Sequence, residues 1–254
     1  QEAFGEDGVK FDEQNAGGEY NNCATIVDGF VSENVDLMLA NATYSLQAAQ
    51  SATADIPILG TAITNYGIAL GLDSTEDKVL GGNISGTSDL APLDQQAAML
   101  QELFPDAENV GLLYCSAEPN SVFQVETIQG DLEEMGYTCT QYACTDVNVL
   151  SAVTQSACDG SDVVYIPTDN TAANNTETIA NVVIPAGVPV VCGESGIYEE
   201  LGLITGEMAV QILTGEADVS ELAIQYDTAV TKMYNATNCE ALGITVPDGY
   251  QPIE

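Results

Sequence analysis

The sequence predicts an α/β protein with two Rossmann-like lobes, in which parallel sheets are flanked by helices. Short apolar runs alternate with helical patterns along most of the chain, and this alternation is typical of parallel sheets with helical crossovers. The alternation also restarts, because residues 35–104 and 110–195 look like two copies of one architecture. We therefore expect two Rossmann-like domains that face a cleft.

The first copy contains apolar runs with the length and branched side chains of buried strands. We expect strands at 35–40, 56–60 and 84–87, and helices at 20–34, 44–53 and 89–104. The helix at 20–34 is expected because its apolar residues recur at helical spacing. A further short strand is expected at 9–14, and the Gly-rich residues 67–82 are expected to form a surface loop.

The second copy repeats the pattern with more strands. We expect strands at 110–115, 137–142, 163–166, 188–192 and 222–226. The helices between and after them are expected at 122–135, 147–158, 172–183, 199–214 and 236–242. Pro105 and Asp106 end the last helix of the first copy, so we expect the chain to cross between the lobes there.

The charge of the chain is unusual. Its 254 residues include 39 acidic side chains but only three basic ones, and the formal net charge is −36. Such a charge repels nucleic acid and anionic membranes, so we expect no binding to either. Because Arg is absent, an anionic group on a ligand has to be held by backbone N–H groups and hydroxyls. The charge favours a cationic or zwitterionic ligand, although nothing in the sequence explains the near absence of basic residues.

The cysteines and the missing histidines limit the chemistry. Without His, neither a His-based triad nor a His metal ligand exists, and the seven Cys form no CxxC motif, so we expect no metal site. Cys115 and Cys192 end apolar runs and are expected to be small buried residues. Cys139 and Cys144 could pair, although nothing local requires it. No apolar run is long enough to span a membrane, and no signal peptide is visible.

The most informative stretch begins with the apolar run 163–166. Pro167 stops strand pairing because it has no N–H to donate, and Thr168, Asp169 and Asn170 follow it. In an open α/β sheet, ligands bind at the carboxyl ends of the strands. These side chains are therefore candidate ligand contacts, although they could equally cap the helix that follows.

Four other predicted strands end in the same way. The compact polar groups at the five strand ends are Asn41 and Thr43; Thr64 and Asn65; Ser116, Glu118 and Asn120; Thr168, Asp169 and Asn170; and Glu194 and Ser195. Each group alone could be a cap or an Asx-turn. Together they suit an α-amino acid, since hydroxyls and helix N-termini suit a carboxylate, and Asp169, Glu118 or Glu194 suits an ammonium group.

Enzyme interpretations are weaker. Residues 81–86 are Gly-rich but lack the Lys of a phosphate-binding loop. Asp169 and Glu194 could form a carboxylate pair, but no nucleophile accompanies them. Ser195 lies in a motif similar to a nucleophile elbow, but it has no His partner. We therefore predict a protein without catalytic residues or a cofactor.

Several strings then resemble a known family. The most specific are 83–89 and 167–170, and 56–64, 110–121, 188–194 and 205–209 occur in the same order. Over roughly residues 5–250 the chain resembles the ABC-transporter substrate-binding proteins of the aromatic amino-acid group, which have a type I periplasmic-binding fold. The resemblance implies three crossovers and a ligand cleft between two lobes, residues 1–107 with 198–224 and residues 108–197 with 225–254.

The resemblance also implies the ligand contacts. The matching positions are Thr43, Thr64, Ser116, Glu118, Asn120, Thr168, Asp169 and Glu194, and we add Ser121 and Asn170 beside them. Asp169 is expected to bind the α-amino group. Asn120 and Ser121, at a helix start, are expected to hold the carboxylate or a contact made on closure.

The implied function is that of an extracytoplasmic binding protein, anchored as a cell-surface lipoprotein or free in the periplasm. We expect a monomer that captures an amino acid, with Trp, Tyr or Phe favoured, by lobe closure and delivers it to an ABC permease. A ligand-sensing domain of the same fold, or a binder of a purine or peptide, remains the alternative. The family pattern also implies a strand before Gly5 and a crossover segment after Ile197 that this sequence lacks.

Overall fold

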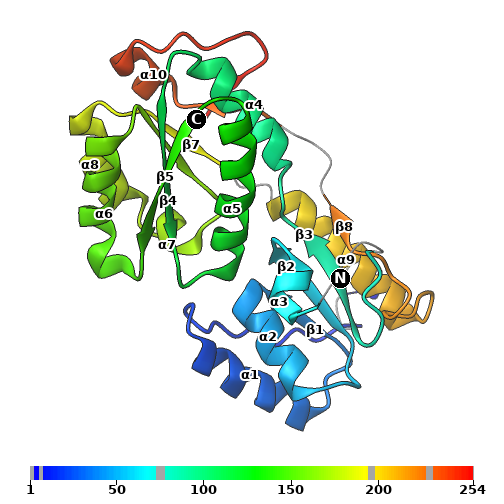
Figure 1. The fold of residues 1–254 in the computed structure, drawn as a ribbon. Helices are drawn as coiled ribbons and strands as arrows, with labels where there is room; N and C mark the ends of the chain where they lie inside the picture. Colours follow the sequence, from blue (N-terminus) through cyan, green and yellow to red (C-terminus); the bar gives the residue numbers. More distant parts are fainter. Residues whose placement is uncertain (1–2, 6–7, 73–77, 194–197, 227–230, 254) are drawn as a thin grey trace. The chain divides into compact units, whose positions relative to one another are not determined.

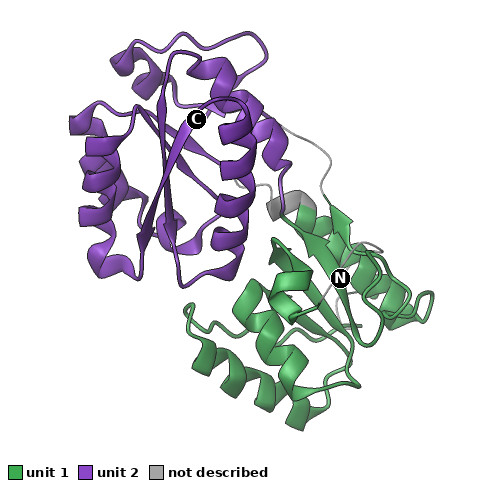
Figure 2. Ribbon diagram, viewed as in Figure 1, with its two compact units in different colours: residues 1–89, 197–227 green, residues 90–196, 228–254 purple. Residues whose placement is uncertain are grey.

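The chain forms two compact units in the computed structural model, which describes residues 3–5, 8–72, 78–193, 198–226 and 231–253 (Figure 1). Unit 1 comprises Gln1–Asp89 and Ile197–Asp227, and unit 2 comprises Leu90–Gly196 and Thr228–Glu254 (Figure 2). The chain therefore passes between the units three times.

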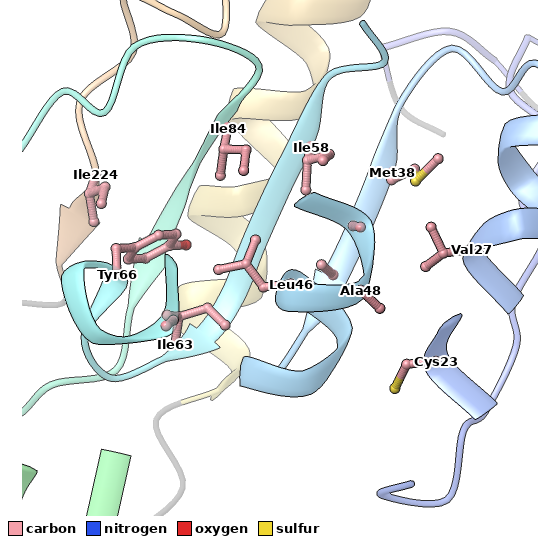
Figure 3. Close-up of a cluster of buried hydrophobic side chains, with 13 residues drawn as sticks. Cys23, Val27, Met38, Leu46, Ala48, Ile58, Ile63, Tyr66, Ile84 and Ile224 are labelled. Carbon is pink, nitrogen blue, oxygen red and sulfur yellow. The ribbon is translucent and has the colours of Figure 1, made fainter. Parts of the chain in front are cut away.

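Unit 1 contains a parallel sheet in the order β1-β2-β3-β8. The strands are β1 (Met38–Asn41), β2 (Ile58–Ile63), β3 (Ile84–Ser88) and β8 (Gln225–Tyr226). The helices are α1 (Tyr20–Glu33), α2 (Thr43–Ala52), α3 (Tyr66–Leu70) and α9 (Tyr198–Thr214). Its core is a cluster of buried side chains around Leu46, Ile58 and Ile63, with Tyr66 beside them (Figure 3). Residues 9–14 form no strand, contrary to the sequence prediction.

Glycines let the strands of unit 1 approach each other. Gly60 of β2 pairs with Gly86 of β3, whose φ of +146° is a conformation that side chains rarely adopt. A Cβ at Gly86 would meet the backbone oxygen of Gly60 and the hydroxyl of Tyr66. That hydroxyl donates a hydrogen bond of 3.1 Å to the carbonyl oxygen of Thr87, so Tyr66 occupies the space that the glycines leave.

Unit 2 contains a parallel sheet in the order β5-β4-β6-β7. The strands are β4 (Asn109–Cys115), β5 (Thr138–Cys144), β6 (Val163–Ile166) and β7 (Val190–Cys192). The helices are α4 (Leu93–Leu103), α5 (Pro119–Glu134), α6 (Val147–Gly160), α7 (Asn170–Ala173) and α8 (Thr176–Ala186). Shorter elements near the end of the chain are β9 (Met233–Tyr234), α10 (Ala236–Leu242) and β10 (Gln251–Pro252).

Helices cover both faces of this sheet, with α5 on one face and α6 and α8 on the other (Figure 1). Each face has its own apolar cluster, and alternate residues of a strand enter different clusters. In β4, Val110 and Leu112 pack with α4 and α5, whereas Leu113 and Cys115 pack with α6 and α8. The sequence run looked uniformly apolar because the strand is buried on both faces.

Two sequence predictions differ from this unit. We expected residues 90–107 to belong to the first lobe, but Ala97 and Leu100 of α4 pack in the core of unit 2. The helix follows the first crossover instead of preceding it. Cys192, which we expected to be buried, is exposed because it ends β7, the edge strand of the sheet.

Candidate functional site

The strand order of unit 2 defines where a ligand is expected. Along β5-β4-β6-β7 the connections run in opposite directions from β4 and β6, which makes the junction of these two strands a topological switch point. In open α/β sheets, ligands bind outside the carboxyl ends of the strands at such a point. The segments that follow β4 and β6 contain Ser116 to Ser121 and Thr168 to Asn170, so the structure brings these predicted residues together at one edge.

Asp169 connects the two segments. It is the N-cap of α7, and its Oδ1 accepts a hydrogen bond of 2.8 Å from the N–H of Ala172. Its Oδ2 accepts one of 2.7 Å from the N–H of Cys115, at the end of β4. The side chain is only 3% exposed. Burial and then the carboxylate of Glu118 raise the pKa of Asp169 above its ordinary value, against the opposite effect of the two N–H donors and of a hydrogen bond from the Ser121 side chain.

Glu118 ties the same segments together nearer the surface. Its Oε2 accepts from the backbone N–H and the side-chain amide of Asn170, both at 2.9 Å. Its Oε1 accepts from the N–H of Thr171 at 2.8 Å and from the hydroxyl of Thr171 at 2.7 Å. The carboxylate thus neutralises the start of α7 and receives four hydrogen bonds from the protein.

The carbonyl oxygen of Thr168 is held by the first turns of α5. It accepts from the amides of Asn120 at 3.0 Å and Gln124 at 3.1 Å, and from the hydroxyl of Ser121 at 3.3 Å. The oxygen of the Gln124 amide accepts from the N–H of Thr168 at 3.2 Å. All four residues are buried. Asn120, Ser121 and Thr168 therefore lie together, and their side chains and backbone are bonded within this part of the protein, to one another, to Gln124 and to Asp169.

Gln124 belongs to this network although the sequence analysis did not select it. The signal was present, since Gln124 follows Asn120 by four residues and so lies on the same face of α5. Gln96 has a similar role in α4. It accepts a hydrogen bond of 2.5 Å from the hydroxyl of Tyr165 and donates one of 3.1 Å to the carbonyl oxygen of Gly193. Both are buried amides, and buried polar groups in proteins are normally hydrogen-bonded.

Ser116 and Glu194 complete the predicted residues of this unit. Ser116 is exposed at the end of β4, and its hydroxyl donates to the carbonyl oxygen of Cys144 at 3.1 Å. Glu194 and the neighbouring Ser195 lie outside the described residues, as does the position after Ile197 where a crossover segment was expected.

The predicted site residues of unit 1 are Thr43 and Thr64. Thr43 begins α2 directly after β1, and Thr64 follows β2, so both lie at the carboxyl edge of the same sheet. Two non-glycine residues with positive φ lie beside them, Ala42 at +69° and Ala62 at +54°. Side chains rarely adopt this conformation, and such strain is concentrated at functional sites. Asn65 is a helix cap, because its side chain accepts from the N–H of Ile68.

Other features of the described residues lie away from this edge. A pocket of about 320 Å³ is lined by Phe104, Pro105 and Asp162, among others, at the amino ends of β4 and β6. It is therefore at the opposite end of the sheet from the switch-point residues. Within the described ranges, no three His, Cys, Asp or Glu side chains gather in a way that could hold a metal ion.

Comparison with known proteins agrees with this architecture. The two parallel sheets flanked by helices are the fold of type I periplasmic binding proteins. The family described as ABC transporter substrate binding protein matches residues 2–250. The chain belongs to this family, whose members bind substrates for transporters and are not enzymes. Proteins of the family are extracytoplasmic.

Three relatives are informative. A tyrosine-binding protein of Clostridioides difficile (strain R20291) is 31% identical over 243 residues, covering 87% of this chain and 70% of the relative. An ABC domain from Streptococcus pneumonia in complex with L-Trp is 29% identical, with a TM-score of 0.92 over 99% of this chain and 90% of that one. The ligand-free, open structure of a substrate binding protein with adhesive properties from Clostridium difficile is 32% identical, with a TM-score of 0.72 over 100% and 92%.

Among the helices of the described residues, none combines the length and the apolar character that crossing a bilayer requires.

Proposed function

We propose that the protein captures an amino acid with an aromatic side chain and delivers it to an ABC permease. The observation that carries the ligand class is the similarity to the L-Trp complex, at a TM-score of 0.92 over nearly the whole chain. The relative that binds tyrosine supports the same class. We further propose that the protein acts as a monomer and that the ligand is trapped by closure of two lobes, which is a common response of two-domain binding proteins.

In the proposed site, the two carboxylates of unit 2 interact with the ligand ammonium group. Asp169 and Glu118 already accept hydrogen bonds from the protein, but each carboxylate has about four acceptor positions. Asp169 accepts from two backbone N–H groups and from the side chain of Ser121, which leaves about one acceptor position for an ammonium group. Glu118 uses four, so Asp169 is the better partner of the two.

The ligand carboxylate requires donors, since Arg is absent from the chain. We propose that hydroxyl and amide groups at the strand ends supply them, with help from N–H groups at helix starts. The candidates in unit 2 are Ser116, Asn120, Ser121, Thr168 and Asn170; those in unit 1 are Thr43 and Thr64. Glu194 remains a candidate from the sequence pattern. The net charge of −36 disfavours a ligand with a net negative charge.

A thermal-shift and calorimetry series tests the proposal. L-Trp, L-Tyr, L-Phe and L-Leu would be compared with tryptamine, which lacks the carboxylate, and indole-3-propionate, which lacks the ammonium group. A ligand that binds the folded state raises the melting temperature by mass action. We expect shifts from one or more aromatic amino acids and from neither analogue. If none of the aromatic amino acids shifted the melting temperature, the ligand class would be contradicted while the family would stay unchanged.

A further inference from the structure

The last residue pair between β4 and β5 consists of two cysteines. The strands pair over seven residues, from Asn109 with Thr138 to Cys115 with Cys144. Both cysteines are free thiols in the structure, and they are 2% and 1% exposed. From the sequence, Cys115 was expected to be a small buried residue, and Cys144 was considered only as a partner of Cys139.

The register also excludes the pairing that the sequence left open. Cys139 packs with the apolar cluster on the α5 face of the sheet, whereas Cys144 packs with the cluster on the α6 face. The two residues lie five positions apart on one strand, at about 3.3 Å per residue, so their side chains lie far apart and point to opposite faces. A disulfide between Cys139 and Cys144 would require the strand to be dismantled.

Cys115 and Cys144 lie on neighbouring strands at the spacing that a disulfide needs, whereas Cys139 and Cys144 do not. Neighbouring strands are about 4.7–4.9 Å apart, and a disulfide joins Cα atoms about 4.4–6.8 Å apart, so the spacing of the two paired strands is within the range that a disulfide spans. Both side chains belong to the same apolar cluster. The thiols interact directly, and burial followed by the proximity of Cys115 raises the pKa of Cys144 to about 12. The Cys144 thiol is therefore not an available nucleophile or metal ligand at neutral pH.

We infer that Cys115 and Cys144 form an intrachain disulfide in the exported protein. The family is extracytoplasmic, and disulfides form and persist in oxidising compartments. Each thiol loses one proton and one electron as the S–S bond forms. A small-molecule or protein disulfide of the compartment accepts both electrons and both protons and is reduced to two thiols. Because the folded state buries both sulfurs, the exchange takes place while the chain folds.

The cross-link would lie directly beneath the candidate ligand edge. The N–H of Cys115 donates to Asp169, and the carbonyl oxygen of Cys144 accepts from both the N–H and the hydroxyl of Ser116, at 2.8 and 3.1 Å. A bond between the two sulfurs would therefore hold the ends of β4 and β5 together where the switch-point segments begin. The inference rests on the location of the family and not on the identity of the ligand.

Peptide mapping of protein exported to the periplasm of a bacterial host tests the inference. Free thiols are alkylated in acidic denaturant, and the chain is then cut with pepsin, because three Lys and no Arg leave trypsin few sites. We expect a peptide containing Cys115 linked to one containing Cys144, with a mass two hydrogens below their sum. Alkylation of both cysteines, or linkage of either to another cysteine, would overturn the inference.

Substitutions provide the controls. Cys158→Ala, in the same apolar cluster, should keep the link, whereas Cys144→Ala should make Cys115 fully alkylatable. Reduction should lower the melting temperature of the wild-type protein by about 5–10 °C, the scale expected for a loop of this length in a chain of this size. The Cys115→Ala, Cys144→Ala double variant should show no such change. If Cys115 and Cys144 of the wild-type protein were both alkylated, the link would be refuted even if the ligand binds as proposed.

Discussion

The two units use the same architecture but differ in strand order. In the described part of unit 1 the strands lie in the order of the chain, β1-β2-β3-β8. In unit 2 the order is β5-β4-β6-β7, and the connections that leave β4 and β6 run in opposite directions along the sheet. Such a reversal separates two connections and leaves a crevice at the carboxyl edge. Among the described strands, those of unit 2 therefore form a switch point and those of unit 1 do not. The polar residues at the strand ends of unit 2 lie around this point.

The chemistry at the two edges differs as well. In unit 2, two carboxylates and three amides form a dense network that joins α5 to the segment after β6. In unit 1 the edge carries hydroxyls beside the strained backbone of Ala42 and Ala62. A polar residue after a strand can thus be scaffold, ligand contact or both. The comparison indicates that carboxylates and amides organise the edge of unit 2, whereas unit 1 combines close backbone packing with hydroxyl contacts such as that of Thr87 with Thr61 at 3.0 Å.

The largest effect is expected from Gly86→Ala in unit 1. The new Cβ would meet the backbone of Gly60 and the hydroxyl of Tyr66, at a φ of +146° that Ala does not readily adopt. We expect a loss of about 3–5 kcal/mol or more in the free energy of unfolding, because neither backbone can move aside cheaply. Urea unfolding followed by circular dichroism would measure it.

Gly130→Ala in α5 is the matched control. A Cβ there meets nothing within 4 Å, and the residue lies inside a helix. Ala should stabilise that helix by about 0.5–1 kcal/mol. Equal losses from both variants would show that close backbone packing does not distinguish unit 1.

A slightly smaller effect is expected on ligand binding from Asp169→Ala in unit 2. If its carboxylate pairs with the ammonium group of the ligand, the change should weaken binding by about 2–5 kcal/mol. Calorimetry with the amino acid identified by the thermal-shift series would measure it.

Asp162→Ala provides the matched control. Asp162 also accepts hydrogen bonds from backbone N–H groups, at 3.0 and 2.8 Å, but lies at the amino ends of the strands. Its loss should leave the affinity unchanged. An unchanged affinity in Asp169→Ala would make that residue a helix cap and nothing more.

Gln124→Leu tests whether the hydrogen bonds around Thr168 stabilise the fold of unit 2. The substitution removes both hydrogen bonds of Gln124 to the backbone of Thr168 and leaves the buried N–H without that partner. We expect a loss of about 1–3 kcal/mol in the free energy of unfolding. Gln129→Leu, in the same helix, removes only hydrogen bonds with Glu133 and Gln141 that are exposed to water, so it should cost less than about 0.5 kcal/mol. If both variants were equally stable, the network would contribute little to unit 2.

The smallest effect is expected from the titration of Asp169. Because the pKa of Asp169 is raised in the folded protein, the folded state binds more protons than the unfolded state above the ordinary pKa of 3.8. Stability from this group is greatest below that pH and decreases as the pH rises through the raised value. Asp169→Asn should therefore remove part of the decrease in stability measured by urea unfolding between acidic and neutral pH. An identical pH profile for both proteins would contradict the assignment.

The sequence alone was sufficient for several conclusions. Apolar runs such as 163–166, stopped by Pro167, identified the parallel strands and the edge at which Asp169 lies. The strings 83–89 and 167–170 identified the family. These features are local, since the length of a strand, the residue at which it ends and the helical spacing of apolar residues depend on neighbouring residues.

Only the tertiary structure decided which distant residues meet. It assigned α4 to unit 2, directed the carboxylates of Glu118 and Asp169 to the backbone, and placed Cys115 opposite Cys144 while separating Cys139 from it. Strand order and register follow from how whole layers pack, and the period of a strand does not specify its partner. For that reason the strand ends that carry the candidate residues could be located from sequence, whereas the hydrogen bonds that these residues make could not.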